Sequence, residues 1–424
     1  MTVSLLDGAF AAKLAQAHGT PYYLYDMDAA LAHLGKLRAH LPDFVDVLYC
    51  MKANANRKVL EAYKPHVAGI DISSAGELDL AVAAGYSPAC MSFAGPGKTH
   101  DELERAISKG LHLLSLESVA ELQRAAEVCA RLGRRQDVTL RVNPLHTPKE
   151  FAMKMGGGAS QFGVAEEDAS AALAAVRAEP RVRLAGIHVF AGTQCLEAAA
   201  ILENLRGTLE IARRLCDEHD VAPEVVNLGG GFGIPYFTGQ EEMDVEALSR
   251  GVGETLAAFR KVHSRFIKTR FILELGRFMI GMFGAYVAKV TEIKETRGKR
   301  YVILDGGMNH CFPATGNFGQ LVKKNYPVRN LTRGGVAELE GDAAGLEPQE
   351  VCGPLCTPMD SMARAVKIAR AEPGDLIAFL HSGAYSYAAS PLLFLSHDTP
   401  LELVKVGGEV TAARPRMPAT RFSP

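Results

Sequence analysis

A lysine ends the apolar run VLYCMK, residues 47–52. Removing an amine from water disfavours its charged form, so Lys52 is expected to have a lowered pKa and to favour the neutral amine that forms an imine with a carbonyl group. A lysine at a strand end can also pack its stem and keep its ammonium in water, which is the commoner arrangement. The role of Lys52 therefore depends on the chemical groups that accompany it.

A glycine-rich run, NLGGGFGIPYF, occupies residues 227–237 and follows an apolar segment. Three consecutive glycines allow the backbone to approach a phosphate closely and to point several N–H groups at it. Ile234 takes the place of the last glycine in a dinucleotide-binding G-x-G-x-x-G motif, so we expect no dinucleotide here. A purely structural glycine turn is the alternative interpretation.

A second segment, GPGKTH at residues 95–100, resembles the end of a nucleotide-binding P-loop. Ser92 stands where the first glycine of that motif belongs, and no helix begins cleanly at the lysine. We therefore interpret this segment as a loop that closes the third strand, and we predict no binding of nucleoside triphosphates.

A carboxylate and an imidazole end two other apolar runs. The carboxylate of Glu274 would stay ionised beside a pyridinium nitrogen and keep that nitrogen protonated, although Glu274 and Arg277 would otherwise be an ordinary surface ion pair. His188 and Phe190 lie two residues apart, so both face the same side of a strand, where an aromatic ring packs on a cofactor or in the core. His188 has no partner ligand at helical spacing, and we expect no metal site.

Two segments near the carboxyl end also carry chemistry. CGPLCTPMD, residues 352–360, places a thiol and a carboxylate in a loop stiffened by proline. Cys356 is suited to donate a proton to a carbanion, although a buried structural cysteine is the commoner case. SGAYSYAASP, residues 382–391, places the hydroxyl group of Tyr385 in a turn where it can reach a phosphate.

The elements that must position these side chains are short apolar runs that alternate with alanine- and leucine-rich stretches. The predicted strands are 47–52, 69–74, 90–94, 111–117, 138–143, 184–190, 224–228 and 270–275, and helical stretches include 101–109, 118–132, 166–178 and 196–219. Eight such repeats over roughly 250 residues are typical of a (β/α)8 TIM barrel, an α/β fold, with a doubly wound open sheet as the alternative. Most runs end in a polar or glycine residue, which favours the barrel because barrel enzymes place active sites at the carboxyl ends of their strands.

The composition of the sequence changes after residue 276. Runs at 285–292, 300–304, 349–352 and 375–380 are rich in valine and isoleucine and are separated by glycine and proline. We therefore predict a barrel domain over 20–276 and a mainly antiparallel β-domain over 277–424, with residues 1–19 as a further contribution to the second domain. Residues 330–348 are glycine-rich and polar, which indicates an exposed loop.

Composition excludes several classes of protein. The chain has 424 residues, a formal net charge of −2 and 48% hydrophobic residues, so it has no basic field for nucleic acid or an anionic membrane surface. None of its eight cysteines forms a C-x-x-C pair, which favours reduced thiols. The first residues lack the cationic start of a signal peptide, and no apolar run reaches membrane-spanning length. We expect a cytoplasmic protein without a membrane segment.

These segments together resemble the diaminopimelate and ornithine decarboxylase family, pyridoxal-phosphate enzymes of fold type III with an alanine-racemase-type barrel and a C-terminal β-domain. The resemblance extends from TPYYLYD (20–26) to FLSHDTPLELV (394–404). Seven motifs occur in the order of the family: YCMKAN (49–54), GIDISSAGEL (69–78), AGTQ (191–194), NLGGGFG (227–233), ELGR (274–277), GPLCTPMD (353–360) and GAYSY (383–387).

The resemblance implies pyridoxal 5′-phosphate as the cofactor and a homodimer with shared active sites. By this resemblance Lys52 holds the cofactor as a Schiff base, Glu274 faces its pyridine nitrogen, and Cys356 donates a proton into the site of the partner subunit. The other cofactor-binding residues that it implies are Asp71, Ser74, His188, Phe190, Thr193, Gly230, Gly231, Gly276, Arg277 and Tyr385. The substrate-binding residues in the matching segments are Asn309, Thr357 and Asp360.

Three departures from the family pattern bear on the cofactor and the substrate. Phe190 replaces the second histidine of the family's H-x-H-x-G-S motif, which stacks on the cofactor ring, and His188 matches only the first. Thr357 replaces the acidic residue that binds a distal ammonium group, and residues 305–328 contain no arginine to bind a distal carboxylate. Because unpaired charged groups are costly in a buried site, we expect poor binding of free diaminopimelate.

Several phrases, among them KMGGG (154–158) and DGGMNH (305–310), resemble a sub-branch of the family. That sub-branch includes a decarboxylase of glutamyl groups on an acyl carrier protein and decarboxylases linked to exosortase gene clusters. It implies decarboxylation of a carrier-tethered or side-chain-modified amino acid, with an acyl or peptidyl carrier protein as a partner. The alternatives are a diaminopimelate decarboxylase proper, a racemase, and a non-catalytic regulatory homologue. The presence of Lys52 and Cys356 argues against the last, and the Cys356 motif argues against a racemase.

Overall fold

The chain folds into two compact units. The computed structural model describes residues 7–237, 239–317, 323–334 and 345–422. One unit, the barrel unit, comprises Leu31–Ile234 and Glu241–Met279. The other, the β unit, comprises the described residues of 1–30, Pro235–Gln240 and 280–424.

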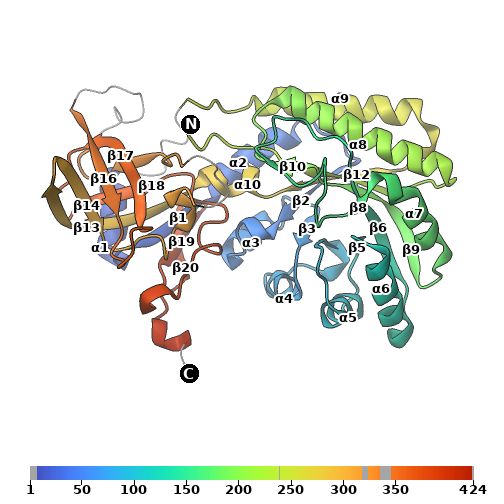
Figure 1. Cartoon of the computed structure of the whole chain (residues 1–424), viewed down its shortest axis with the longest axis horizontal. Helices are drawn as coiled ribbons and strands as arrows, with labels where there is room; N and C mark the ends of the chain where they lie inside the picture. Colours follow the sequence, from blue (N-terminus) through green and yellow to red (C-terminus); the bar gives the residue numbers. More distant parts are fainter. Residues whose placement is uncertain (1–6, 238, 318–322, 335–344, 423–424) are drawn as a thin grey trace. The chain divides into compact units, whose positions relative to one another are not determined.

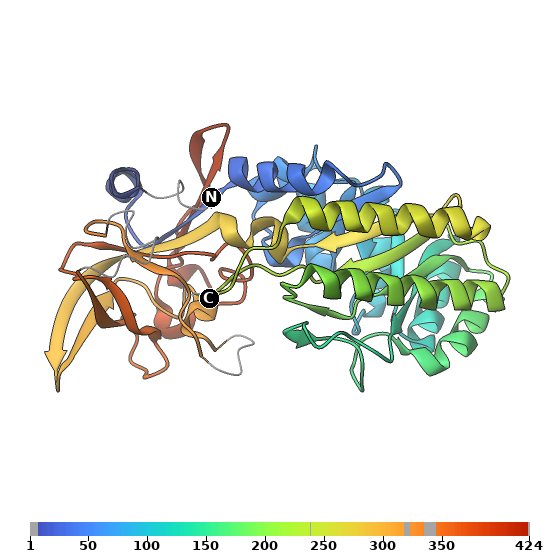
Figure 2. The same cartoon turned by 90° about the horizontal axis from the view of Figure 1, so that it is seen from above.

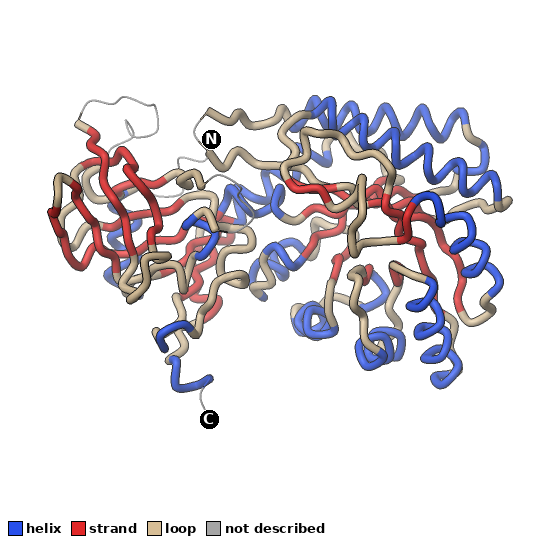
Figure 3. The backbone as a smooth tube through the Cα atoms, in the orientation of Figure 1, coloured by secondary structure: helices blue, strands red, loops and turns tan. Residues whose placement is uncertain are grey.

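The barrel unit contains a closed parallel barrel, as predicted (Figures 1 and 3). Its eight strands are β2 (Val45–Cys50), β3 (Gly69–Ile72), β4 (Met91–Phe93), β5 (Leu113–Leu116), β6 (Gln136–Asn143), β9 (Val182–Val189), β11 (Val225–Gly230) and β12 (Arg270–Leu275). They pair in the order β5-β4-β3-β2-β12-β11-β9-β6, and β6 pairs with β5 to close the ring. The TIM-barrel expectation is thereby confirmed, and the open-sheet alternative is excluded.

One helix precedes the first barrel strand and the others follow barrel strands; they cover the strands from outside, with α8 and α9 lying side by side (Figures 1 and 2). They are α2 (Met27–Arg38), α3 (Arg57–Tyr63), α4 (Ala75–Ala83), α5 (His100–Ser108), α6 (Val119–Leu132), α7 (Ala169–Ala178), α8 (Ala198–Glu218), α9 (Val245–Val262) and α10 (Arg277–Ile280). Local sequence sets their limits: the Ser118 side chain accepts a hydrogen bond from the Glu121 N–H at the start of α6, and Gly133 ends that helix with φ 62°.

Two strands end earlier than their apolar runs, and both ends matter for the site. β2 stops at Cys50, and residues Met51–Ala53 form a single 3-10 turn that carries Lys52. β3 stops at Ile72 because Ser74 already caps α4, accepting a hydrogen bond from the Glu77 N–H at 3.1 Å. The side chains expected at these two strand ends therefore lie on short turns above the barrel.

The β unit is a nine-stranded mixed sheet in which most pairs are antiparallel, in agreement with the predicted β-domain (Figure 3). Its strands are β1 (Tyr22–Asp26), β13 (Gly284–Thr296), β14 (Lys299–Leu304), β15 (Val328–Asn330), β16 (Leu346–Cys352), β17 (Ser361–Ala369), β18 (Leu376–Phe379), β19 (Leu401–Val406) and β20 (Glu409–Arg414). Only the β1–β19 and β14–β16 pairs are parallel. One face buries alternate residues of β1, β13, β18 and β19 in a single core.

The amino-terminal segment belongs to the β unit through Ala30, which is further than the expected boundary at Thr20. β1 is inserted between β13 and β19, and helix α1 (Gly8–His18) packs Ala11 and Leu14 against the same core. The physical reason is the run YYLYD, whose five residues are all buried as an interior strand of the sheet.

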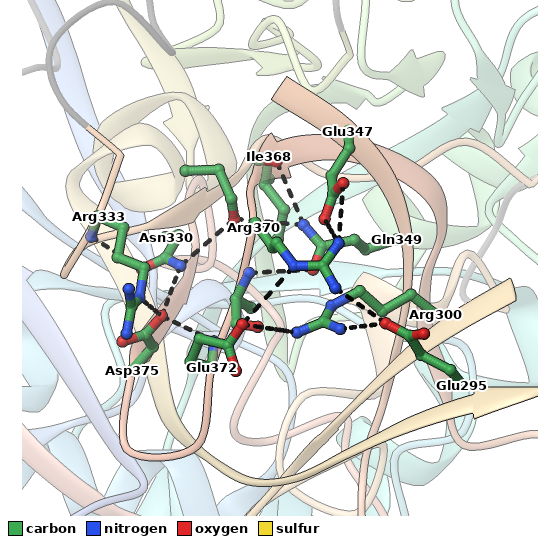
Figure 4. Close-up of polar contacts among 12 residues, drawn as sticks. Glu295, Arg300, Asn330, Arg333, Glu347, Gln349, Ile368, Arg370, Glu372 and Asp375 are labelled. Carbon is green, nitrogen blue, oxygen red and sulfur yellow. Dashed lines mark hydrogen bonds and ion pairs between the residues drawn. The ribbon is translucent and has the colours of Figure 1, made fainter. Parts of the chain in front are cut away.

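A network of charged side chains connects the strands near the β17 edge of the sheet in the β unit (Figure 4). Arg300 pairs with Glu295 and Glu372, and Arg370 pairs with Glu295 and Glu347. The network ties β13, β14 and β16 to the end of β17 and shows no catalytic geometry, so we assign it to stability. Ion pairs in a network contribute more to folding stability than isolated surface ion pairs do.

The exposed loop expected over 330–348 is too long at both ends, because β15 ends at Asn330, Asn330 and Leu331 are buried, and β16 begins at Leu346. Residues 335–344 of that segment lie outside the described residues. Among the described helices, none combines the length and the apolar composition that crossing a bilayer requires.

Candidate active site

The amine of Lys52 lies beside a buried carboxylate at the carboxyl ends of the barrel strands. Lys52 Nζ is 3.3 Å from Asp71 Oδ2, and the pairing of β2 with β3 places Cys50 opposite Asp71. The Lys52 side chain is 40% exposed, whereas that of Asp71 is fully buried. The amine is therefore open to an incoming molecule while its acidic neighbour is shielded from water.

Three neighbouring strands bring a second cluster of polar groups together. β11 runs between β9 and β12, so Asn227 lies opposite His188 on one side and opposite Ile272, two residues before Glu274, on the other. Asn227 Nδ2 donates to Glu274 Oε1 at 2.5 Å, and His188 Nε2 is 3.5 Å from Glu274 Oε2. The other ring nitrogen of His188 lies 2.7 Å from the hydroxyl of Ser115. All of these side chains are buried, so their orientations are set by one another.

Their environments give the two buried acids different affinities for protons. Burial and the nearby charge of Glu274 raise the pKa of Asp71 to about 7. Burial would also raise the pKa of Glu274, but His188, Lys52 and Asn227 together outweigh it and lower that pKa to about 2. Glu274 is therefore ionised at neutral pH, whereas the pKa of Asp71 lies close to neutral pH.

An aromatic ring lies between two cationic side chains near this cluster. The ring centroid of Phe190 is 6.0 Å from Lys52 Nζ and 5.9 Å from the guanidinium carbon of Arg141. Arg141 is nearly buried and donates to Glu117 Oε1 at 2.6 Å. Phe190 is thus half-buried with one face toward the lysine, whereas His188 is buried and held by polar contacts.

The glycine-rich turn after β11 is closely packed against neighbouring strands. Gly230 pairs with Glu274, and a Cβ atom on Gly230 would lie 1.9 Å from the carbonyl oxygen of Glu274. Gly231 has φ 85°, and a Cβ atom there would lie 2.3 Å from the carbonyl oxygen of Gly192. Thr193 follows Gly192 on the short strand β10 (Gly192–Thr193), which pairs with β7 (Met153–Lys154). The structure therefore brings Thr193 and the glycine turn together.

The remaining expected residues of the barrel unit surround Lys52 or cap adjacent helices. A Cβ atom on Gly276 would lie 3.0 Å from Cβ of Ala53 and 3.1 Å from Cβ of Cys50, so Gly276 packs directly on the Lys52 turn. Arg277 is the first residue of α10. The hydroxyl oxygen of Ser74 accepts the Glu77 N–H, which leaves its own hydrogen available as a donor.

The other expected residues belong to the β unit, where an aspartate joins two of their loops. Asp360 accepts hydrogen bonds from the Met308 N–H at 2.6 Å and from the Leu355 N–H at 2.8 Å. Asn309 and Cys356 follow these two residues in the chain, so Asp360 holds their segments beside each other. Cys356 is exposed.

Three further details of the β unit concern expected substrate and cofactor residues. The hydroxyl oxygen of Thr357 accepts the Met359 N–H at 3.3 Å. Asn309 is fully buried, and neither polar atom of its side chain has a hydrogen-bond partner among the described residues. Tyr385 follows β18 in a turn with φ 60°.

Several residues of the site were not predicted from the sequence. Three of them share one signal, a polar side chain inside an apolar strand: Ser115 in LLSL, Asn227 in VVNLGG and Arg141 in TLRV. The fourth, Glu117, follows β5 directly and pairs with Arg141. A polar residue in a buried strand requires a partner, which marks it as part of a network.

Cys50, Asp71 and Glu274 place possible metal ligands within 4.8 Å of one another. Both carboxylates already have a nitrogen neighbour, since Lys52 Nζ lies 3.3 Å from Asp71 and His188 Nε2 lies 3.5 Å from Glu274. Burial and the nearby charge of Asp71 also raise the pKa of the Cys50 thiol, which opposes the thiolate form that binds metals. We therefore continue to expect no metal at this cluster.

Residues 29–281 match the family model described as the pyridoxal-binding domain of pyridoxal-dependent decarboxylases. The chain is 36% identical over 409 residues to the L-glutamyl-[BtrI acyl-carrier protein] decarboxylase of Niallia circulans, covering 96% of this chain and 94% of the relative. It is 31% identical over 393 residues to the 2-[(L-alanin-3-ylcarbamoyl)methyl]-2-hydroxybutanedioate decarboxylase of Staphylococcus aureus, covering 91% and 94%.

The fold is also similar to that of a solved enzyme. The crystal structure of diaminopimelate decarboxylase from Helicobacter pylori, complexed with L-lysine, matches with a TM-score of 0.85 and 25% identity. The match covers 97% of this chain and 98% of that chain, so it includes both units.

Proposed function

The chain belongs to the pyridoxal-dependent decarboxylases, amino-acid decarboxylases that use pyridoxal phosphate, and from this premise we propose that it acts on a carrier-tethered or side-chain-modified amino acid. The observation that carries the proposal is the position of Lys52 Nζ, 3.3 Å from Asp71 at the open end of a barrel whose interior also holds Glu274. An accessible amine beside two buried acids of unequal pKa suits carbonyl chemistry.

The residues of the barrel unit fit pyridoxal phosphate by the chemistry of their donors. When bound, this cofactor supplies an electron sink for the charge left by departing carbon dioxide. Lys52 would hold it covalently, Glu274 offers an ionised carboxylate for its ring nitrogen, and the glycine backbone at 230–231 would approach its phosphate closely. The Nε2 atom of His188 is buried without a well-aligned hydrogen-bond partner among the described residues, which is consistent with a site that is completed by a ligand.

We assign the surrounding residues according to what each one contacts. Asn227 and His188 orient the carboxylate of Glu274, and Phe190 presents an aromatic face beside the amine of Lys52. Asp71 holds the Lys52 amine and exchanges its proton. The residues proposed to hold the phosphate or to pack around it are Ser74, Thr193, Gly230, Gly231, Gly276, Arg277 and Tyr385.

Cys356 is proposed as the proton donor to the α-carbon of the substrate. It is exposed, and its loop is held by the two hydrogen bonds that Asp360 accepts from backbone N–H groups. Asp360 is accordingly proposed to position the loop of Cys356, and Asn309 and Thr357 to meet the substrate. Cys356 and Lys52 belong to different units of the chain, which is compatible with a homodimer whose subunits each complete the other's site.

We infer the substrate class from two charged groups that the sequence lacks and from the substrates for which two relatives are named. Thr357 offers no negative charge to a distal ammonium, and residues 305–328 contain no arginine for a distal carboxylate. The two relatives are named for a glutamyl group on an acyl carrier protein and for an alanine unit joined through an amide to a hydroxybutanedioate. Neither is a free diamino acid. Diaminopimelate decarboxylation remains the second candidate, because the fold match is to such an enzyme.

Product analysis tests this proposal. Purified holoenzyme would be incubated with meso-diaminopimelate, lysine, ornithine, and aminoacyl groups on a carrier protein, and each product would be weighed by mass spectrometry. We expect loss of 44 Da, the mass of carbon dioxide, from a tethered or modified amino acid and little turnover of the three free diamino acids. Lys52→Ala is the control for cofactor-dependent loss. Efficient turnover of free diaminopimelate alone would contradict the proposed substrate class.

A further inference from the structure

A cationic pocket lies in the β unit, next in sequence to the loop of Cys356. It has a volume of about 380 Å³. Its lining is Phe237, Thr315, Lys323, Lys324, Asn325, Ser361, Met362, Ala363 and Arg364. Three of these nine residues are cationic and none is acidic. Ser361 directly follows Asp360, so the pocket and the Cys356 loop share one continuous segment.

The described lining of this pocket offers three cations and no carboxylate. The segment 312–325 contains no acidic residue, and Arg364 Nε donates to the hydroxyl of Ser361 at 3.3 Å. Two carboxylates flank the segment of Arg364: Asp360 accepts two backbone N–H groups, and Glu350 pairs with Lys299 and accepts the Ala365 N–H at 3.3 Å. A lining that carries three cations and no acidic side chain attracts anions.

Arg364 is positioned by a bulge in β17. Ala363 pairs with Val351 and Val366 pairs with Gln349, so Arg364 and Ala365 together oppose the single residue between those partners. Ala365 has φ 44°, a left-handed conformation that is strained for a residue with a side chain. Such strain persists where surrounding contacts enforce it, and bulges often redirect a side chain at a binding site.

Asn325 supplies the contacts that enforce the bulge. Its Nδ2 donates to the carbonyl oxygen of Arg364 at 2.8 Å, and its Oδ1 accepts from the Arg364 N–H at 3.0 Å. The Asn325 side chain thus takes the place of a strand partner for Arg364. The same short segment carries Lys323 and Lys324, so these two hydrogen bonds hold its backbone beside that of Arg364.

Two further contacts place the lysines. A Cβ atom on Gly316, which has φ 72°, would lie 3.2 Å from Cβ of Lys323, so the chain at Gly316 packs closely against that residue. The ammonium of Lys324 lies 5.5 Å from the ring centroid of Phe237, within the range of a cation–π contact. The pocket is therefore built by tertiary contacts rather than by a chance cluster of surface lysines.

We propose that this pocket, formed by Lys323, Lys324 and Arg364, binds a remote anionic group on the side chain of the substrate while the α-carbon is presented to Cys356. The inference rests on the proposed function and deepens it. The remote group is an anion with several oxygen atoms. It is either the phosphate of a phosphopantetheine arm or the carboxylates of a polycarboxylate side chain. Guanidinium and ammonium groups bind both through charge-assisted hydrogen bonds.

Binding to the holoenzyme is measured first, by calorimetry and without turnover. The probes are 4′-phosphopantetheine against pantetheine, and tricarballylate against its triamide, so that each pair differs in charge. We expect the dissociation constant of at least one anion to be about 10- to 100-fold lower than that of its neutral counterpart, as three partly exposed ion pairs would give. The anion that binds identifies the source of the remote group.

The variant Lys323→Ala/Lys324→Ala/Arg364→Ala should abolish that preference. The matched control is Lys294→Ala/Arg297→Ala/Lys367→Ala, which removes three cations of the same unit that lie outside the pocket and should keep the preference. Equal binding of charged and neutral probes to the unmodified protein, or loss of the preference in the control variant as well, would overturn the inference.

Kinetics then separate this inference from the proposed function. The pocket variant should have a higher KM than the unmodified enzyme for a substrate that carries the preferred anion. This increase should be at least about tenfold larger than the change in KM for a neutral-tailed analogue. If the unmodified enzyme decarboxylates neither class of modified amino acid, the proposed function fails. If it decarboxylates the anionic substrate and the pocket variant has an unchanged KM, only the anion pocket is refuted.

Discussion

The Nε2 atom of His188 lies 3.5 Å from Oε2 of Glu274, and both side chains are almost completely buried. The imidazole is fixed from its other side by the hydroxyl of Ser115, and the carboxylate is fixed by Asn227. A chain of polar contacts thus crosses the barrel interior from β5 to β12 and keeps Glu274 negatively charged. The folded environment therefore keeps Glu274 ionised at neutral pH.

Replacing Glu274 by glutamine tests how much its negative charge contributes to catalysis. Glu274→Gln keeps the size and shape of the side chain but removes the negative charge and replaces one acceptor oxygen by an NH2 donor, so kcat should fall at least about a hundredfold. Steady-state decarboxylation and the absorbance of bound pyridoxal phosphate would be measured together. The exposed Glu254→Gln is the control and should retain full activity. Equal activity in Glu274→Gln with the cofactor retained would remove Glu274 from the proposed mechanism.

Asp71 should make the cofactor-free protein less stable as the pH rises. Burial and the charge of Glu274 raise its pKa to about 7 in the folded protein, whereas an unfolded chain releases the proton near pH 4. The folded state therefore binds more protons between these values, and the free energy of unfolding falls as pH increases through that window. Asp71→Asn removes this titration, so at pH 8 the variant should be more stable by ~2–4 kcal/mol.

The measurement for Asp71 is urea unfolding of cofactor-free protein at several values between pH 5 and 8. The difference between Asp71→Asn and the unmodified protein should grow with pH and nearly vanish toward pH 4. A constant difference across the whole range would mean that Asp71 does not titrate in this window.

The shared-site proposal predicts complementation between two inactive variants. Neither Lys52→Ala nor Cys356→Ala should decarboxylate alone, because each lacks a group that every site requires. Mixed one to one with subunit exchange, half of the dimers would contain one intact site, which gives about a quarter of the original activity. Activity and subunit exchange would be followed in the same sample. Demonstrated exchange with no recovered activity would contradict the assignment of Cys356 to the partner's site.

Thr357 should control the preference for a distal ammonium. Thr357→Glu places a negative charge where the unmodified protein has a neutral hydroxyl, so kcat/KM for lysine and ornithine should rise about 10- to 100-fold relative to a neutral-tailed substrate. Thr357→Gln has nearly the same size without the charge and should leave the ratio unchanged. An equal shift in both variants would show that size, not charge, decides the selectivity.

Two glycines should respond in opposite ways to a methyl group. Gly230→Ala places its Cβ 1.9 Å from the carbonyl oxygen of Glu274 and must separate β11 from β12, which should cost ~3 kcal/mol of unfolding free energy. Gly207→Ala lies within α8, where a Cβ atom meets nothing within 4 Å, and should stabilise the protein by ~0.5–1 kcal/mol. Urea unfolding of both variants provides the comparison.

The sequence alone determined the barrel, the order of its strands and the local motifs on them. Eight apolar runs separated by helical stretches predict eight parallel strands, and each run lies within about two residues of an observed strand. Such agreement is expected because hydrophobic periodicity and capping residues act over a few positions. The segment around Lys52 was likewise recognisable without a structure.

Only the tertiary structure decided which polar groups meet. In the sequence Asn227 is one polar residue in an apolar strand, yet its side chain donates to Glu274 on β12 and its backbone lies opposite His188 on β9. The position of β1 in the β unit and the bulge that directs Arg364 have the same origin. Strand pairing joins segments that are far apart in the chain, and the energies that select a partner come from burial and hydrogen bonding across that distance, which local sequence patterns do not encode.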